Sequence, residues 1–336
     1  MKKRFMAAVM LIALCAAPAS AAPKVLTLAE RTAQDRAAMQ GNFFSRTGEA
    51  FKNDILTHHR GGVYGPWAEL REAVSVTDTE FDGHAVYLMN GKNGAVPGAT
   101  KKILYVHGGA WVLESPMHQL DFAAWLANNS GAEVWFPEYP LAPEHHAAES
   151  HEWLVKLYQE MLKNAPAAEI AVMGDSAGGA IAAGLAMQLR DRGLPQPNNL
   201  ILFSPGVDIM LYRTDAENDY NNKLAAAGLN AVVSSRQRDI MDMWRGDLPE
   251  TDYRVNPVYG DLRGLAPLTV FAGSAESISI HRFIARAAVQ RVPVKYWEKL
   301  NAPHVWVTDA NQDCAEERAF VLDLLRTPDD AAAQKK

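Results

Sequence analysis

The pattern with the clearest chemical meaning is Gly-Asp-Ser-Ala-Gly-Gly at residues 174–179. An apolar, strand-like run at 170–173 precedes it, and an alanine-rich stretch typical of a helix follows it. A serine on a tight turn between a strand and a helix projects its hydroxyl beyond the sheet, and the N–H groups that open the helix face developing negative charge. The pattern therefore predicts a nucleophile at Ser176. A turn without chemistry is the alternative, and the flanking strand and helix disfavour it.

A second glycine pair ends an earlier apolar run at 103–106, where His107 is followed by Gly108 and Gly109. Adjacent glycines let backbone N–H groups approach a substrate oxygen closely. Gly108 and Gly109, with the N–H of Ala177, are therefore predicted to form an oxyanion hole. A glycine turn that only closes a strand is the alternative. His107 is expected to be structural and to hold this loop by hydrogen bonds.

These patterns together resemble the hormone-sensitive-lipase-like esterases of the α/β-hydrolase fold. His-Gly-Gly at 107–109 and the serine motif at 174–179 stand in that family's order, with Glu-Tyr-Pro-Leu-Ala-Pro-Glu-His at 138–145 between them and Ser-Pro-Gly-Val-Asp at 204–208 after them. The resemblance extends from about residue 100 to residue 306. It implies an α/β-hydrolase fold and a carboxylesterase or acetylhydrolase activity that needs no cofactor, and it says little about the substrate.

The family order also implies that the acid and the base follow Ser176 in the chain. The histidines after that point are His281, in a helical stretch, and His304, after the last predicted strand, where the family places its base. Glu276 is the first carboxylate after the seventh predicted strand, where the family places its acid; a solvated loop glutamate is the alternative. A carboxylate on Nδ1 of His304 would fix its tautomer. Ser-Ile-His at 279–281 departs from the family, because many relatives carry further acidic residues there.

Strand-like and helical runs alternate from about residue 72 onwards. Such alternation predicts a mostly parallel, eight-stranded sheet with helices on both faces and with its chemistry at the carboxyl ends of the strands. Two longer stretches, 24–70 and 207–264, are predicted to form a helical lid. The predicted strands are 73–77, 85–89, 102–106, 133–136, 169–173, 199–203, 268–271 and 294–297, and the predicted helices are 119–128, 147–163, 177–192, 235–244 and 282–289.

The N-terminus has the three regions of a secretory signal. Basic residues at 2–4 precede an apolar run at 5–17 and small residues at 18–22, so we expect a signal peptide at 1–21 and cleavage after Ala21. An uncleaved anchor is one alternative, although the 13 apolar residues are fewer than the roughly 20 that span a bilayer. A lipoprotein at Cys15 is another, and the bulky Leu14 disfavours it. We expect export to the periplasm or the medium without a stable membrane anchor.

Composition predicts one globular domain at 22–327 with a disordered tail at 328–336. The chain has 336 residues, of which 48% are hydrophobic, so it can bury a sizeable core. Signal cleavage would remove three basic residues and take the formal net charge from −6 to −9, which argues against nucleic acid as a partner. Cys314 would then be the lone cysteine, which excludes an internal disulfide. No metal is expected either, because His151-Glu152 lacks the second histidine of a zinc-binding helix.

The predicted chemistry is acyl transfer to Ser176, with His304 as the base, followed by hydrolysis of the acyl-enzyme. The expected partner is a small-molecule ester with a small or medium acyl group. An amidase or formamidase, or a lactonase, could use the same residues and stays open. A binding protein built on this fold would have lost one of the three residues, and all three are present. Acyl length, alcohol portion and oligomeric state are left open.

Overall fold

The computed structural model describes residues 25–39, 48–58, 65–92, 100–208, 237–274, 276 and 278–326. The predicted signal, the predicted tail and residues 209–236 of the predicted lid lie outside the described residues. Among the helices that are described, none has the length and apolarity to cross a lipid bilayer.

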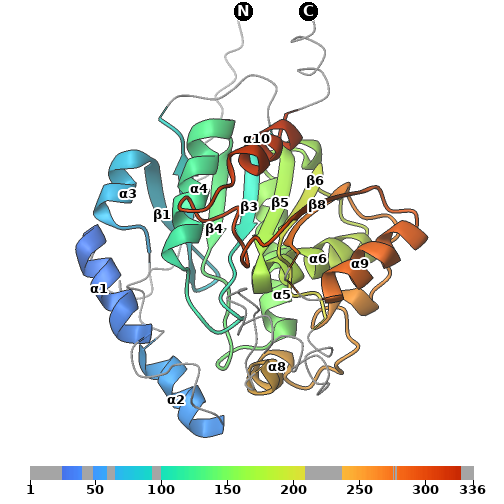
Figure 1. Cartoon of the computed structure of the whole chain (residues 1–336), viewed down its shortest axis with the longest axis horizontal. Coiled ribbons are helices and arrows are strands. Elements are labelled where there is room, and N and C mark those ends of the chain that lie inside the picture. Colours follow the sequence, from blue (N-terminus) through green and yellow to red (C-terminus); the bar gives the residue numbers. More distant parts are fainter. Residues whose placement is uncertain are drawn as a thin grey trace, which may run out of the picture.

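The centre of the molecule is one sheet of eight strands (Figure 1). The strands are β1 (Ser75–Phe81), β2 (His84–Asn90), β3 (Lys102–Val106), β4 (Glu133–Pro137), β5 (Ile170–Asp175), β6 (Asn199–Phe203), β7 (Leu268–Gly273) and β8 (Val294–Lys299). Their spatial order is β1-β2-β4-β3-β5-β6-β7-β8. β1 pairs antiparallel with β2, β2 pairs antiparallel with β4, and all later neighbours are parallel. The predicted mostly parallel, eight-stranded sheet is thereby confirmed.

Helices cover both faces of this sheet. They are α1 (Leu28–Met39), α2 (Gly48–His58), α3 (Ala68–Ala73), α4 (Met117–Ser130), α5 (Ala147–Leu162), α6 (Ser176–Asp191), α8 (Gln237–Arg245), α9 (Ile278–Val289) and α10 (Ala315–Leu324), with short 3₁₀ turns at Ala167–Glu169 and Pro257–Tyr259. Buried residues of α2, α5, α6, α8 and α9 belong to one core, and those of α3, α4 and α10 belong to a second.

The central strands separate these two cores because successive side chains of a strand point to opposite faces. On β3, Leu104 and Val106 belong to the core beside α5 and α6, whereas Ile103 and Tyr105 belong to the core beside α4. β5 is buried along its whole length, as expected for a strand covered on both faces. The sheet therefore holds the segment that leads into Ser176 rigidly.

Two predicted elements have ends that differ from the structure by as many as four residues. The strand predicted at 73–77 begins later, because Ala73 ends α3, and it runs on to Phe81, where Asp82 and Gly83 take positive φ angles of 43° and 84° and turn the chain into β2. The helix predicted at 282–289 already begins at Ile278, two residues after Glu276. The loop between β7 and α9, which contains Glu276 and is called the acid loop below, is therefore shorter than the sequence pattern suggests.

The lid stays a prediction, because its centre is not described. The helix predicted at 235–244 corresponds to α8. The N–H of Gly48, which opens α2, donates to a carboxylate oxygen of Asp239 on α8 at 3.0 Å. Helices from the two predicted lid segments therefore meet, and Figure 1 places both at the same end of the molecule.

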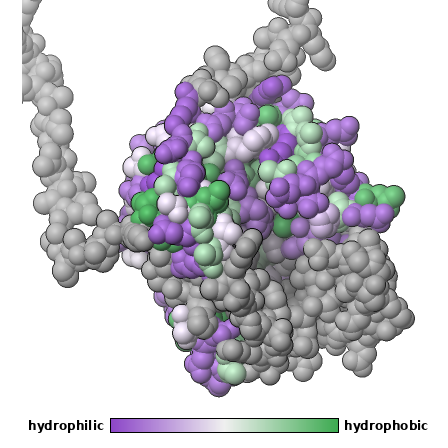
Figure 2. Space-filling model, turned by 60° about the vertical axis from the view of Figure 1, so that its left-hand side comes forward, coloured by the Kyte–Doolittle hydropathy of each residue, from purple (hydrophilic) through white to green (hydrophobic). Residues whose placement is uncertain are grey.

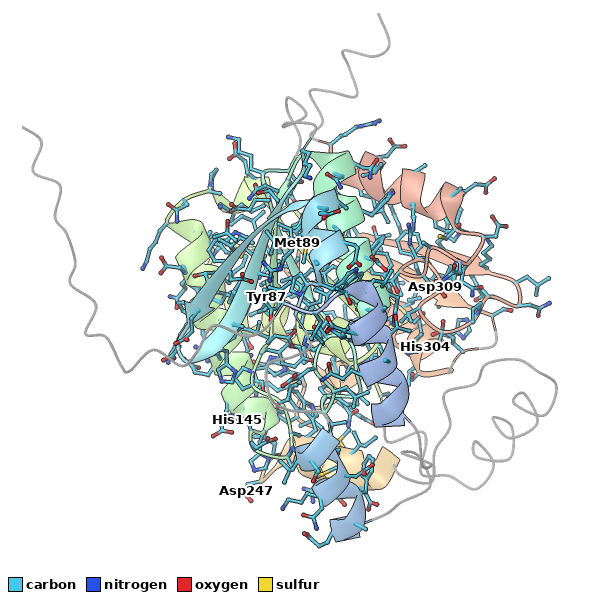
Figure 3. All side chains as sticks on the ribbon, turned by 90° about the vertical axis from the view of Figure 1, so that its left-hand side faces the viewer. Tyr87, Met89, His145, Asp247, His304 and Asp309 are labelled. Atoms are coloured by element: carbon cyan, nitrogen blue, oxygen red, sulfur yellow. The ribbon has the colours of Figure 1, made fainter. Side chains whose placement is uncertain are left out.

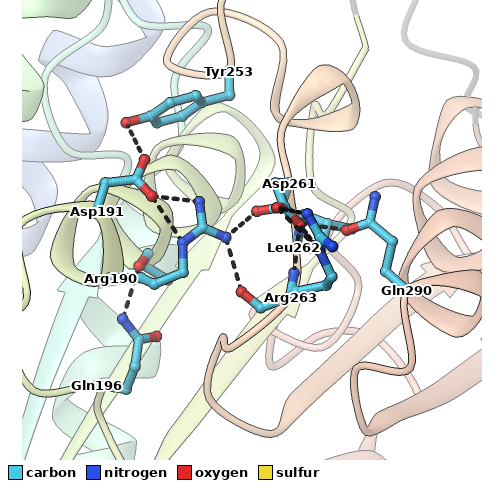
Figure 4. Close-up of polar contacts among 9 residues, drawn as sticks. Arg190, Asp191, Gln196, Tyr253, Asp261, Leu262, Arg263 and Gln290 are labelled. Atoms are coloured by element: carbon cyan, nitrogen blue, oxygen red, sulfur yellow. Dashed lines mark hydrogen bonds and ion pairs between the residues drawn. The ribbon is translucent and has the colours of Figure 1, made fainter.

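Polar contacts at the C-terminal end of α6 fasten the segment that joins α8 to β7 (Figure 4). Arg190 donates to the carbonyls of Asp261 and Arg263, and its guanidinium also contacts Asp191 at 2.6 Å. The hydroxyl of Tyr253 donates to the same Asp191 carboxylate at 3.2 Å. The chain that enters β7 is thus tied to the helix that begins with the predicted nucleophile.

The described surface that Figure 2 shows is mainly hydrophilic, with hydrophobic residues in small groups. Scattered apolar residues of this kind are normal on a globular protein. Among the described residues, the large hydrophobic side chains that are exposed are Val25, Leu28, Leu56, Val289 and Leu300.

Candidate active site

Ser176 is the first residue of α6 and lies on a tight turn after β5, with a φ of +52°. A non-glycine residue rarely adopts this conformation, and such strain is common at functional sites. The neighbouring glycines are required sterically. A Cβ on Gly178 would lie 2.1 Å from the carbonyl oxygen of Val106, and a Cβ on Gly174 would lie 2.4 Å from that of Gly178. The turn can therefore form only with glycine at both positions.

The three residues predicted to carry the chemistry come together at the carboxyl ends of β5, β7 and β8. His304 lies on the loop after β8 (Figure 3), and its Nε2 is 2.9 Å from Oγ of Ser176. Its Nδ1 is 3.3 Å from Oε2 of Glu276, whose side chain is 6% exposed. One imidazole nitrogen thus faces a hydroxyl and the other faces a carboxylate, which is the arrangement that lets a histidine remove the hydroxyl proton.

The loop after β3 lies directly against Ser176. A Cβ on Gly108 would lie 2.9 Å from Cβ of Ser176, so only glycine permits this approach. The backbone then turns through positive φ angles of 118° at Gly109 and 53° at Ala110. The N–H of Gly108 donates to Oδ1 of Asp175 at 3.2 Å. Because that N–H already has an acceptor, the geometry does not support Gly108 as an oxyanion donor.

Asp175 is a fully buried carboxylate that fixes this loop beside Ser176. Besides the N–H of Gly108, it accepts hydrogen bonds from the hydroxyl of Tyr105 at 2.9 Å and from Nε2 of Gln119 at 2.5 Å. Burial raises the pKa of Asp175 to about 6, although these donors favour the charged form. The loop, β3 and α4 are thus joined at one buried group.

His107 holds the same loop from the other side, in agreement with its expected structural role. Its buried ring lies between the rings of Phe136 and Tyr139, and its Nε2 is 3.3 Å from Oε2 of Glu138. Burial lowers the pKa of His107, but the carboxylate of Glu138, the carbonyl of Gly108 and the charge of Asp175 together outweigh burial and leave this pKa above its ordinary value. The hydroxyl of Tyr139 donates to the carbonyl of His107 at 2.9 Å. Nothing in this environment directs His107 toward Ser176.

His281 takes no part in the contacts among Ser176, His304 and Glu276, as its helical pattern suggests. It is exposed on α9, where its Nε2 is 2.8 Å from Oε2 of Glu298 and 3.0 Å from the hydroxyl of Tyr296. His304 is therefore the histidine that the fold brings to Ser176.

Some residues that organise the site have no clear signal in the sequence. Gln119 falls in a predicted helix and looks like any polar helical residue, yet it reaches the buried carboxylate of Asp175. Ser204 stands in the segment that resembles the family after the sixth strand, and its hydroxyl bonds to Glu276. That resemblance was a signal, but the side-chain contact was not predictable from it.

A family model described as the α/β hydrolase fold matches residues 103–308. The chain belongs to the α/β-hydrolase family. The matched part of this α/β-hydrolase contains Ser176, Glu276 and His304, together with the loop after β3. It does not include α1 to α3 or the hairpin of β1 and β2.

Individual relatives agree with this assignment. An esterase of Acinetobacter venetianus is 30% identical over 235 residues, which cover 67% of this chain and 76% of that protein. An acetyl-hydrolase of Streptomyces hygroscopicus is 30% identical over 218 residues, which cover 61% of this chain and 68% of that protein. A solved hormone-sensitive lipase from a metagenome library is 25% identical, with a TM-score of 0.66, and covers 90% of this chain and all of that one. The resemblance to hormone-sensitive-lipase-like esterases is confirmed, and so is a carboxylic-ester hydrolase at the level of the family.

Proposed function

We propose that this α/β-hydrolase cleaves esters of small to medium carboxylic acids through a triad of Ser176, His304 and Glu276. The observation that supports this most directly is that His304 Nε2 lies 2.9 Å from Ser176 Oγ while its Nδ1 faces Glu276. His304 removes the hydroxyl proton as Oγ attacks the ester carbonyl, and Glu276 stabilises the imidazolium that forms. His304 then protonates the leaving alcohol, and water, activated by the same imidazole, releases the acyl group.

We place the oxyanion donors at the N–H groups of Gly109, Ala110 and Ala177, in place of Gly108. Ala177 is the second residue of α6, where a helix leaves its N–H groups without intrahelical acceptors. The positive φ angles at Gly109 and Ala110 support a loop that turns its N–H groups away from β3. Two backbone segments would then meet the developing negative charge from different directions.

The names of the relatives support the substrate class. An esterase and an acetyl-hydrolase match 67% and 61% of this chain, so acetyl and similarly small esters are the first substrates to test. The proposal includes export through a signal at 1–21 to the periplasm or medium, and a lid built from parts of 24–70 and 207–264. Both of these parts rest on the sequence pattern.

The decisive test is hydrolysis of p-nitrophenyl esters from acetate to laurate by the mature protein. We expect activity on the shorter chains, and we expect Ser176→Ala to lower kcat by about 10⁴-fold or more because it removes the nucleophile. Circular dichroism of the variant checks that it is folded. A fluorophosphonate should label the wild-type protein at Ser176 and leave the variant unlabelled.

Other outcomes would redirect the proposal. Full activity of Ser176→Ala would exclude this serine as the nucleophile. A folded wild-type protein that hydrolyses no ester and is not labelled would contradict the esterase proposal. Formamides, lactones and simple ligand binding would then be tested in its place.

A further inference from the structure

Ser204 occupies an unusual position immediately after β6. Its side chain is 1% exposed, and its φ of +47° lies in the left-handed region that glycine and asparagine favour. Its N–H donates to the carbonyl of Phe271 on β7 at 2.7 Å. Ser204 is therefore held in a strained conformation between β7, which precedes the acid loop, and the loop after β8. This second loop carries His304 and is called the base loop.

The hydroxyl of Ser204 contacts both of these loops. It donates to Oε1 of Glu276 at 2.5 Å, and it accepts the N–H of Val305, the residue after His304, at 3.0 Å. Oε1 also accepts the N–H of Gly273 at 2.9 Å. With two donors on Oε1, the carboxylate is held so that Oε2 faces Nδ1 of His304.

We infer that Ser204 is a positioning residue that couples the acid loop to the base loop. This inference rests on the proposed function, because it assigns Ser204 a role through the Glu276–His304 pair. A donor on Oε1 orients the carboxylate, and an acceptor for the Val305 N–H fixes the backbone next to the imidazole. Val305 itself has a φ of +54°, so the base loop is also constrained at this point. One hydroxyl thus sets the relative position of two residues on the loops that follow β7 and β8.

A purely structural role makes a different prediction. A buried hydroxyl that only satisfies a backbone N–H contributes to folding stability and leaves kcat unchanged. Ser130 offers a matched control, because its buried hydroxyl donates to the carbonyl of Leu126 and accepts the N–H of Ala132, far from Ser176 in the chain. Ser130→Ala should lower the melting temperature without changing kcat.

The test uses two variants of Ser204 in the full-length protein. Ser204→Gly removes the hydroxyl and suits the positive φ, whereas Ser204→Ala removes the hydroxyl and keeps the strain. We expect both to lower kcat on p-nitrophenyl acetate by about 10- to 100-fold, with KM within about threefold of the wild type. We expect the alanine variant to have the lower melting temperature. Wild-type kcat in both variants would overturn the inference.

A double-mutant cycle shows whether Ser204 acts through Glu276. Glu276→Gln should lower kcat strongly, and adding Ser204→Gly to it should lower kcat by less than about threefold, because residues that act as a unit are not additive. An undiminished effect of Ser204→Gly in that background would contradict the inference. The proposed function fails in a different way, through an inactive wild-type protein or a fully active Glu276→Gln variant, so the two failures are distinguishable.

Discussion

Asp175, next to the nucleophile, shows how one residue can organise the site while lowering stability at neutral pH. Its carboxylate joins the loop after β3 to α4, but burial raises its pKa to about 6 from an ordinary value of 3.8. The folded protein therefore holds this proton more tightly than the unfolded chain does. Because proton binding favours the folded state, this group makes the free energy of unfolding fall as pH rises from about 4 to about 6.

We predict that Asp175→Asn removes this pH dependence. The new amide oxygen can accept from Tyr105 and Gly108, and its nitrogen can donate to Oε1 of Gln119 after that amide flips; Oε1 has no partner among the described residues. Between pH 4.5 and 7 the stability of the variant should improve relative to the wild type by about 2 kcal/mol. Urea unfolding at several pH values measures this. A constant difference across that range would contradict the prediction.

At the scale of elements, helix α1 is anchored to the framework of the site although it lies outside the family match. Arg31 on α1 is 1% exposed, and its guanidinium donates to the carbonyls of Gly65 at 3.1 Å and Ser115 at 2.7 Å. The N–H of Ser115 in turn donates to Glu138, the partner of His107. The N-terminal part of the proposed lid is therefore fixed where the chain leaves the loop after β3.

We predict that Arg31→Met loosens α1. The substitution keeps an unbranched apolar chain but removes the donor from one buried and one partly buried carbonyl oxygen, so the free energy of unfolding should fall by about 2 to 4 kcal/mol. Hydrogen exchange should become faster at residues 28–39. Arg326→Met is the control, because the side chain of Arg326 forms an exposed ion pair with Asp323 and should contribute about 1 kcal/mol or less. Unchanged exchange in α1 would show that Arg31 is not its anchor.

At the scale of the whole molecule, a buried histidine opposes the pH effect of Asp175. His151 on α5 is fully buried, and its Nε2 donates to the carbonyl of Arg254 at 3.0 Å, which ties α5 to the segment after α8. Burial lowers the pKa of His151 to about 4, below the ordinary 6.5. Its contribution to stability is therefore present above about pH 6.5 and is lost as pH falls toward 4. The two buried groups largely cancel in the wild type.

We predict that His151→Gln makes the folded protein less sensitive to acid than the wild type. Glutamine keeps an N–H donor for Arg254 and does not titrate, so the variant should lose about 2 kcal/mol less stability than the wild type between pH 7 and 4.5. Unfolding in urea across that range measures the difference. In the double variant with His151→Gln and Asp175→Asn, the free energy of unfolding should depend on pH nearly as it does in the wild type. Equal acid sensitivity of His151→Gln and the wild type would show that this histidine is not a source of acid lability.

The sequence by itself determined the fold class, the family and the candidate nucleophile. Strand and helix periods are local properties, so all eight strands were predictable to within a few residues. The turn at Ser176 was predictable because the strand, the glycines and the helix follow one another along the chain, and a Cβ on Gly174 would clash with the carbonyl oxygen of Gly178, only four residues away. The acid and base candidates came from the order in which the resemblance places them. These features depend on neighbours along the chain or on a pattern that many chains share.

Only the tertiary structure decided which side chains support the site. Arg31 meets Ser115 across 84 residues, Ser204 meets Val305 across 101, and Gln119 meets Asp175 across 56. Ser204 lies in a segment that resembles the family, but none of these contacts could be predicted, because a hydrogen bond depends on the position of two groups in space and leaves no periodic pattern. The same is true of the Gly108 N–H, because only the folded chain brings the carboxylate of Asp175 within hydrogen-bonding distance of it. These contacts are important because a buried polar group that lacks a partner is costly, and burial is a property of the packed molecule.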